Sequence, residues 1–175
     1  MAHGLRHAVQ RHMERQSKAS VGVVTPVRGL NLVRSRSTTE LEYTVAQPLV
    51  CLVLQGCKRV SLGSGTLSYA AGDTMVVTGN VPTVSRISKA SVAEPYLALA
   101  LDLDLAVIAD LVMRAPEVHS RSSARDTSEE LRDALRRLMS LLDCPESLAV
   151  LKDGLIRAIH HWLLLGRQGL DIRRL

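Results

Sequence analysis

The chain has 175 residues, of which 46% are hydrophobic and 22% are charged, and this balance excludes disorder along its whole length. The length suits one domain, or one domain with an appended helical layer. The net charge of +5 is spread over both ends and the middle of the chain, which is typical of solvated faces and not of a single nucleic-acid-binding surface.

Residues 1–20 predict an N-terminal helix or arm. Four residues of this segment share one helical face: Leu5, Val9, His12 and Met13. The segment is polar and basic and has no apolar centre, so it does not resemble a secretory signal peptide. No apolar run anywhere in the chain approaches the roughly 20 residues of a membrane-spanning helix, so we expect no membrane partner.

Residues 21–103 predict a β-barrel. The apolar strand 49–54 runs into a bend at Gly56, a half-buried strand follows, and Gly63-Ser64-Gly65 is suited to a tight hairpin. Further on, apolar residues alternate, as in the strand 96–102. Short strands at regular spacing favour a barrel or sandwich, and the strand–glycine–strand order resembles a small barrel of the cupin kind.

The pattern changes near Leu103, and residues 104–166 predict a helical region. Asp104 is placed to cap a first helix, and Thr127-Ser128-Glu129-Glu130 is a capping box that would open the next one. That helix aligns four leucines in one stripe: Leu131, Leu135, Leu138 and Leu142. The stripe is either the partner face of a dimer or a packing seam onto the barrel, and the sequence leaves both open.

Taken together, these elements predict an α+β, mainly β fold. It consists of a cupin-like double-stranded β-barrel followed by a C-terminal helical layer. The last nine residues, 167–175, are expected to form a linker.

One run of residues, Pro48-Leu49-Val50-Cys51-Leu52-Val53-Leu54-Gln55-Gly56-Cys57-Lys58-Arg59-Val60, resembles the N-terminal domain of a subgroup of AraC-type transcription regulators. The resemblance continues in several shorter strings: Gly72-Asp73, Glu94-Pro95-Tyr96-Leu97-Ala98-Leu99, Leu101-Asp102-Leu103-Asp104, the segment 138–146 and the segment 163–169. The order and spacing of these strings carry the resemblance, which extends from about Val21 to the end of the chain.

The resemblance implies a cupin-like domain that binds an effector and forms dimers. In such regulators a helix-turn-helix domain follows and reads DNA, and this chain stops at Leu175, about where that domain would begin. We therefore expect residues 167–175 to lead toward an absent DNA-binding domain, and DNA to be contacted only through it. The expected partners are a small-molecule effector and a second copy of the chain.

The chain has no Phe, one Trp and only three Tyr, so any internal pocket is expected to be lined mostly by aliphatic side chains. We therefore expect the effector to be small and largely apolar. The candidate effector-binding residues are Tyr43, Cys51, Val53, Tyr69, Leu97 and Leu99. Cys51 lies in an apolar strand, where a thiol is normally inert core packing, although a position on the cavity wall would let it meet an electrophile. The odd number of cysteines, without metal-ligand spacing, indicates reduced thiols in a cytoplasmic protein.

The chief alternative is a metal-dependent cupin enzyme, an isomerase or a dioxygenase. Such a site needs two or three histidines and a carboxylate converging in the barrel, and no histidine occurs between Gly22 and Glu117. When Gly56 and Gly72 are matched to the barrel's glycines, the ligand positions fall near four residues that are poor ligands: Tyr43, Val45, Leu49 and Thr83. We therefore predict no catalytic residue, no metal and no cofactor. We expect five histidines to be exposed titrating side chains: His3, His7, His12, His160 and His161.

Overall fold

The computed structural model describes residues 2–16, 22–63, 65–114 and 124–175. The chain forms two compact units, Met1–Asp102 and Leu103–Leu175. We call the first the β-unit and the second the helical unit.

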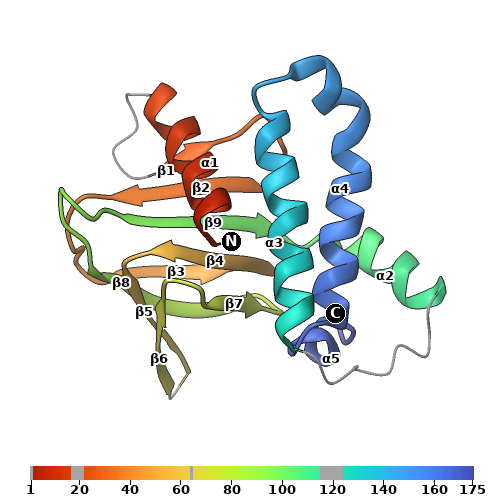
Figure 1. The fold of residues 1–175 in the computed structure, drawn as a ribbon. Coiled ribbons are helices and arrows are strands. Elements are labelled where there is room, and N and C mark those ends of the chain that lie inside the picture. Colours follow the sequence, from red (N-terminus) through yellow and green to blue (C-terminus); the bar gives the residue numbers. More distant parts are fainter. Residues whose placement is uncertain (1, 17–21, 64, 115–123) are drawn as a thin grey trace. The chain divides into compact units, whose positions relative to one another are not determined.

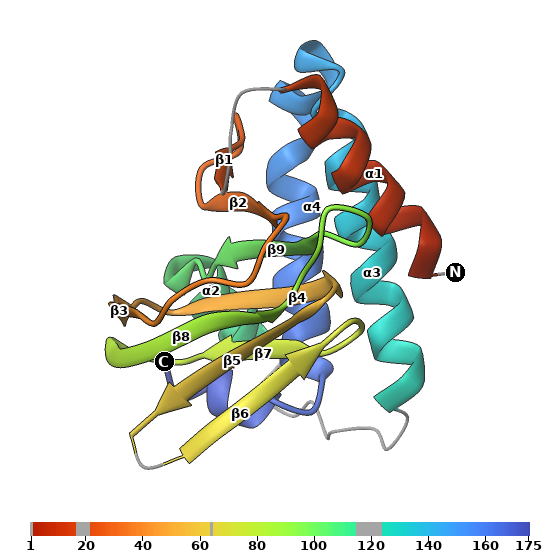
Figure 2. The ribbon, with the colours of Figure 1, turned by 90° about the vertical axis from the view of Figure 1, so that its left-hand side faces the viewer.

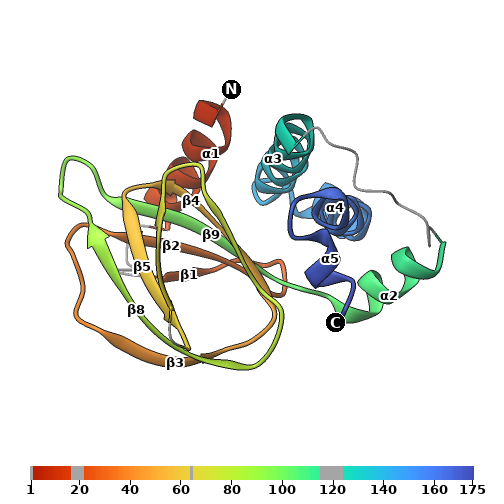
Figure 3. The same ribbon diagram turned by 90° about the horizontal axis from the view of Figure 1, so that it is seen from below.

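The β-unit consists of one helix and two antiparallel sheets that face each other (Figures 2 and 3). The five-stranded sheet has the order β1-β2-β9-β4-β7 and the four-stranded sheet the order β3-β8-β5-β6. The elements are α1 (Ala2–Arg15), β1 (Gly22–Val24), β2 (Leu30–Ser35), β3 (Glu42–Ala46), β4 (Leu49–Gln55), β5 (Cys57–Leu62), β6 (Gly65–Ala70), β7 (Thr74–Val77), β8 (Val81–Lys89) and β9 (Tyr96–Asp102). This arrangement confirms the predicted cupin-like, mainly β fold.

The central strands of the five-stranded sheet are apolar on both faces, and the fold explains why. On β4, four consecutive residues from Val50 to Val53 are buried, because one face of the sheet lines the barrel interior while α1 packs on β4, β9 and β2. Leu5, Val9 and Met13 of α1 are buried, as their shared helical face predicts. The helix thus covers part of a sheet face that would otherwise expose leucines to water.

The turn between β4 and β5 requires a glycine. Gly56 has a φ of 80°, in a region that side-chain-bearing residues rarely adopt. A Cβ atom at this position would lie 2.5 Å from the carbonyl oxygen of Lys89. The close approach of these two backbone segments therefore depends on the absence of a side chain.

The helical unit contains α2 (Leu105–Arg114), α3 (Ala124–Leu141), α4 (Pro145–Leu165) and α5 (Gly169–Ile172). Helices α3 and α4 pack side by side (Figure 1). Helix α3 begins at Ala124, three residues before the predicted start at Thr127. The segment 167–175, expected to be a linker, contains α5, and Ile172 is buried within it.

Helix α2 is attached to α4 through its first residues. The carboxylate of Asp104 accepts hydrogen bonds from the backbone N–H groups of Ala106 and Val107 at 3.0 and 3.1 Å, so Asp104 caps the helix as predicted. The backbone N–H of Asp104 in turn donates to Nε2 of His160 at 2.9 Å. The Nδ1 of His160 lies 2.7 Å from the carbonyl oxygen of Ile156, so it must be the protonated nitrogen.

His160 is 1% exposed and His12 is 7% exposed, so the expectation that both are exposed titrating side chains is wrong. Burial lowers the pKa of His160, and the hydrogen bond to Ile156 and the charge of Asp104 oppose that effect only in part. The imidazole is therefore held neutral, as an acceptor for Asp104. His3 lies outside the residues whose side chains the structure describes. Over the described ranges, no helix has both the length and the apolar composition that a bilayer crossing requires.

Candidate functional site

The interior of the β-unit is lined by apolar side chains from both sheets. Residues of β4, β7 and β9 face residues of β5 and β8 in one buried cluster. Its members are Cys51, Val53, Val60, Met75, Val77, Ile87, Tyr96 and Ala98. Tyr69 and Leu62 pack against this cluster and are themselves only partly buried.

A cavity of about 340 Å³ lies within the β-unit, and this volume is in the range of small-molecule sites. Its lining residues come from β3, the segment that follows β3, and strands β4, β5, β7, β8 and β9. They are Thr44, Val45, Ala46, Gln47, Leu49, Lys58, Val60, Met75, Val77, Thr83, Ser85 and Asp102. Because Val60, Met75 and Val77 also belong to the buried cluster, the cavity reaches from the surface into the core of the barrel.

Hydroxyl groups from β3 and β8 contribute to the polar part of the wall. The Thr44 and Thr83 hydroxyls lie 2.8 Å apart and share a hydrogen bond, and the Thr83 hydroxyl also lies 3.3 Å from the Thr44 carbonyl oxygen. Ser85, two residues further along β8, is 6% exposed. The alternation of β8 thus sends Thr83, Ser85 and Ile87 to the same interior face.

Cys51, Tyr69 and Tyr96 remain neutral in this interior. Burial raises the pKa of the Cys51 thiol, although the charge of Lys58 and a hydrogen bond with Tyr96 act in the opposite direction. Burial also raises the pKa of Tyr96, and that of Tyr69, where the negative charge of Asp73 adds to the effect. A thiol that is mostly protonated is a poor nucleophile.

The structure brings together three of the six candidate effector-binding residues. Cys51, Val53 and Tyr69 all belong to or pack against the interior cluster, although none of them is among the residues that line the cavity. Tyr43 on the edge strand β3 is 74% exposed.

Leu97 and Leu99 lie on the opposite face of β9 from the interior. Tyr96 and Ala98 belong to the interior cluster, and successive side chains of a strand point to opposite faces. Both leucines are buried, at 0 and 1% exposure, but outside the barrel. Because both faces of β9 are apolar, the alternation alone did not tell which face is the inner one, and the placement of Leu97 and Leu99 in the effector site is corrected accordingly.

None of the twelve residues that line the cavity was a candidate effector-binding residue, and three of the missed residues are polar side chains of β5 and β8: Lys58, Thr83 and Ser85. The sequence did contain a pattern that indicates Lys58. On β5 it lies two residues before Val60 and four before Leu62, so its side chain points to the same face as theirs. A lysine is rarely placed on an interior face, and composition gave no reason to look for one there.

The donor set of the barrel does not fit a metal centre. Across the described ranges, no three His, Cys, Asp or Glu side chains come together in a group that could hold a metal ion. Val45, Leu49 and Thr83, which align with cupin ligand positions, line the cavity, and the side chains of Val45 and Leu49 carry no donor atom.

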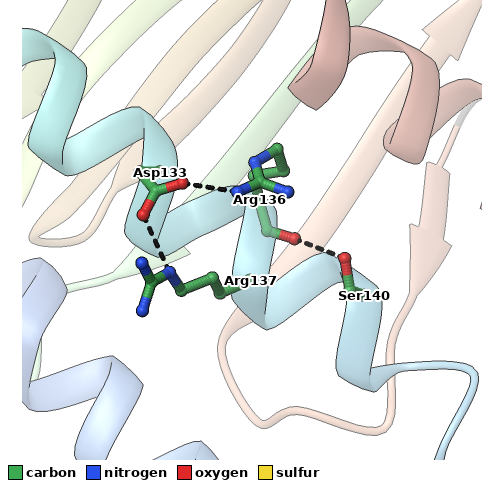
Figure 4. A network of polar contacts seen from close by, with 4 residues as sticks. All are labelled: Asp133, Arg136, Arg137 and Ser140. Atoms are coloured by element: carbon green, nitrogen blue, oxygen red, sulfur yellow. Dashed lines mark hydrogen bonds and ion pairs between the residues drawn. The ribbon is translucent and has the colours of Figure 1, made fainter.

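The leucine stripe of α3 is largely removed from solvent within a single chain. Leu135, Leu138 and Leu142 are 2, 0 and 8% exposed, and Leu131 is partly buried. Polar residues occupy other positions on the same helix (Figure 4): Asp133 pairs with Arg136 at 2.6 Å and with Arg137 at 2.8 Å, and the Ser140 hydroxyl donates to the Arg136 carbonyl oxygen at 3.0 Å. Within the helical unit α3 packs against α4, and the choice between a dimer face and a packing seam for this stripe stays a prediction.

The fold and cavity define a class of protein, a cupin-like barrel followed by helices, whose interior lacks a metal-binding donor set in its described part. A family model described as the N-terminus of AraC-type transcriptional regulators matches residues 26–170. This range covers most of the chain, and the chain therefore belongs to that family.

Solved structures give weaker likenesses. Protein NMB1881 from Neisseria meningitidis is 13% identical with a TM-score of 0.41, over 55% of this chain and 96% of that one. A cupin-2 domain protein from Shewanella frigidimarina is 13% identical with a TM-score of 0.36, over 53% and 92%. A cupin superfamily protein from Desulfitobacterium hafniense is 10% identical with a TM-score of 0.37, over 50% and 80%. These likenesses say nothing about what this chain binds, and no curated protein sequence matches it.

Proposed function

We propose that this chain is the ligand-sensing and dimerisation domain of an AraC-type transcription regulator, and that it binds a small effector in the barrel. The observation that carries the proposal is the cavity of about 340 Å³ in a chain of this family. Its deeper wall is made of aliphatic side chains such as Val60, Met75 and Val77, which favour an effector with an apolar body.

The effector acts by preferring one arrangement of the protein over another, since a ligand shifts an equilibrium only by its difference in affinity for the two states. DNA is contacted by a helix-turn-helix domain outside these residues, in the cytoplasm. Two chains pair, and size-exclusion chromatography with light scattering measures this directly. A strict monomer at high protein concentration contradicts the pairing.

A thermal-shift screen with small metabolites tests the effector site. A ligand present at 100 times its Kd stabilises the folded state by about 2.7 kcal/mol, which raises Tm by roughly 5–10 °C for a chain of this size. The cavity-filling variant Ala46→Phe is expected to lose the shift, because Ala46 lines the cavity. Ala70→Phe is the matched control, since Ala70 is an exposed strand residue of the same unit, and it is expected to keep the shift.

The proposal includes a non-catalytic role. The alternative of a metal-dependent isomerase or dioxygenase lacks support in the donor set of the barrel. Metal analysis of the purified protein decides between the two: stoichiometric iron, manganese or zinc that survives a chelator would overturn the non-catalytic role. If no metabolite raises Tm, and the variants behave alike, the effector site itself is refuted.

A further inference from the structure

Lys58 places a positive charge on the inner face of the barrel. On β5 it pairs with Tyr69 of β6 and with Ile87 of β8. It shares a face with Val60, which is 3% exposed, and it lines the cavity. Lys58 itself is only partly exposed, and its positive charge acts on the buried thiol of Cys51.

No carboxylate neutralises this charge within the described residues. Asp102 is the acidic residue among those that line the cavity, and it is exposed at the end of β9. The positive charge of Lys58 acts on Cys51 of β4, and Cys51 lies opposite Ala100 of β9. Ala100 precedes Asp102 by two residues, or about 6–7 Å of strand. Asp102 therefore belongs to the mouth of the cavity and Lys58 to its deeper part.

A second polar group in the cavity wall has no partner. Ser85 is 6% exposed, lies opposite Val60 in the sheet, and lines the cavity. In the described part of the chain its hydroxyl makes no side-chain hydrogen bond, unlike Thr83, whose hydroxyl is paired with Thr44. Among the described residues the Ser85 hydroxyl is not sealed off from solvent, so it is open to the cavity and can donate a hydrogen bond to a bound ligand.

We propose that the effector is a small organic carboxylate with an apolar body, and this proposal rests on the effector-binding function proposed above. The ligand's carboxylate accepts hydrogen bonds from the Lys58 ammonium and the Ser85 hydroxyl. Its body lies along the aliphatic wall that Leu49, Met75 and Val77 form. One ammonium balances one monoanion, whereas a phosphate dianion would leave an uncompensated negative charge in a largely apolar enclosure.

The test compares acids with their uncharged analogues. Isothermal titration calorimetry near neutral pH measures the binding of benzoate and of unbranched carboxylates from butanoate to decanoate, each against its amide. Charge-assisted hydrogen bonds contribute more than neutral ones, so we expect the best carboxylate to bind about 10- to 100-fold more tightly than its amide.

Two methionine variants locate the preference. Lys58→Met is expected to bind acid and amide within about two-fold of each other. Arg59→Met is the matched control, because Arg59 is the next residue on β5, is exposed and points away from the interior; it is expected to keep the wild-type preference. The comparison of acid with amide on the unmodified chain stands even if Lys58→Met fails to fold.

The outcomes separate the two proposals. Three results would overturn the carboxylate inference and leave the effector site intact. In the first, amides bind the unmodified chain as tightly as the acids; in the second, neutral ligands bind while no carboxylate does. In the third, the preference for the acid survives Lys58→Met. A barrel that takes no ligand of any charge in the metabolite screen would refute the effector-binding function itself.

Discussion

The substitution His160→Leu tests how the helical unit is held together. The Nε2 of His160 accepts the Asp104 backbone N–H at 2.9 Å, and its Nδ1 lies 2.7 Å from the Ile156 carbonyl oxygen. Leucine approximates the volume of the ring and is suited to a site that is 1% exposed. The change therefore removes two hydrogen bonds while leaving little empty space.

The two lost bonds differ in cost. Ile156 still accepts the backbone N–H four residues further along α4, so losing the side-chain donor costs little. The Asp104 N–H loses its acceptor, and an unsatisfied buried donor costs about 1–3 kcal/mol. Asp104 itself is exposed, so water offsets part of the loss. We expect a decrease of about 1–2 kcal/mol in the free energy of unfolding near pH 7.5.

The pH dependence has a definite sign. The folded-state pKa of His160 lies below its ordinary value of 6.5, so between these two values the unfolded chain binds a proton that the folded chain does not. Stability from the neutral imidazole is complete above about pH 6.5 and decreases as the pH falls toward the folded-state pKa. His160→Leu lacks this component, so its deficit relative to the unmodified chain should shrink as the pH is lowered from 7.5 to 5.

Urea titrations followed by circular dichroism, at several pH values, measure these differences. His161→Leu is the matched control, because His161 neighbours His160 on α4 but packs its ring edge-on against Trp162; it is expected to lose less stability than His160→Leu at pH 7.5. A His160→Leu deficit that stays constant from pH 7.5 to 5, or no deficit at all at pH 7.5, would refute the assigned role of the imidazole.

Two further predictions concern the β-unit and the thiols. Gly56→Ala should destabilise the fold by more than the roughly 1–2 kcal/mol that a positive φ costs a non-glycine residue, because its Cβ would lie 2.5 Å from the Lys89 carbonyl oxygen. Gly63→Ala is the control in the same urea titration. The φ of Gly63 is also positive, at 58°, but apart from its chain neighbours no atom of the described structure lies within 4 Å of the new Cβ. Equal losses of stability in the two variants would contradict the close approach at Gly56. Iodoacetamide should modify the exposed Cys144 first and the buried Cys51 only after unfolding, as peptide mass spectrometry would show; early modification of Cys51 would mean that the interior is open.

The family comparison and the barrel agree with what local patterns in the sequence already indicated. The apolar strand 49–54, the bend at Gly56 and the amphipathic face of α1 are properties of neighbouring residues, and such properties can be read from periodicity. The cap at Asp104 depends only on side-chain chemistry one turn away. These elements were therefore predictable before any tertiary contact was known.

The order of residues along a strand settles which side chains share a face, whereas the assembly of distant strands settles which face is inside. On β9, Leu97 and Tyr96 lie on opposite apolar faces, and only the packing of this sheet against the four-stranded sheet makes the Tyr96 face the inner one. Lys58 became a cavity residue for the same reason, and His160 acquired its partner Asp104 from 56 residues away. Alternation is a local property of the backbone, whereas enclosure requires strands and helices that are distant in the chain to meet.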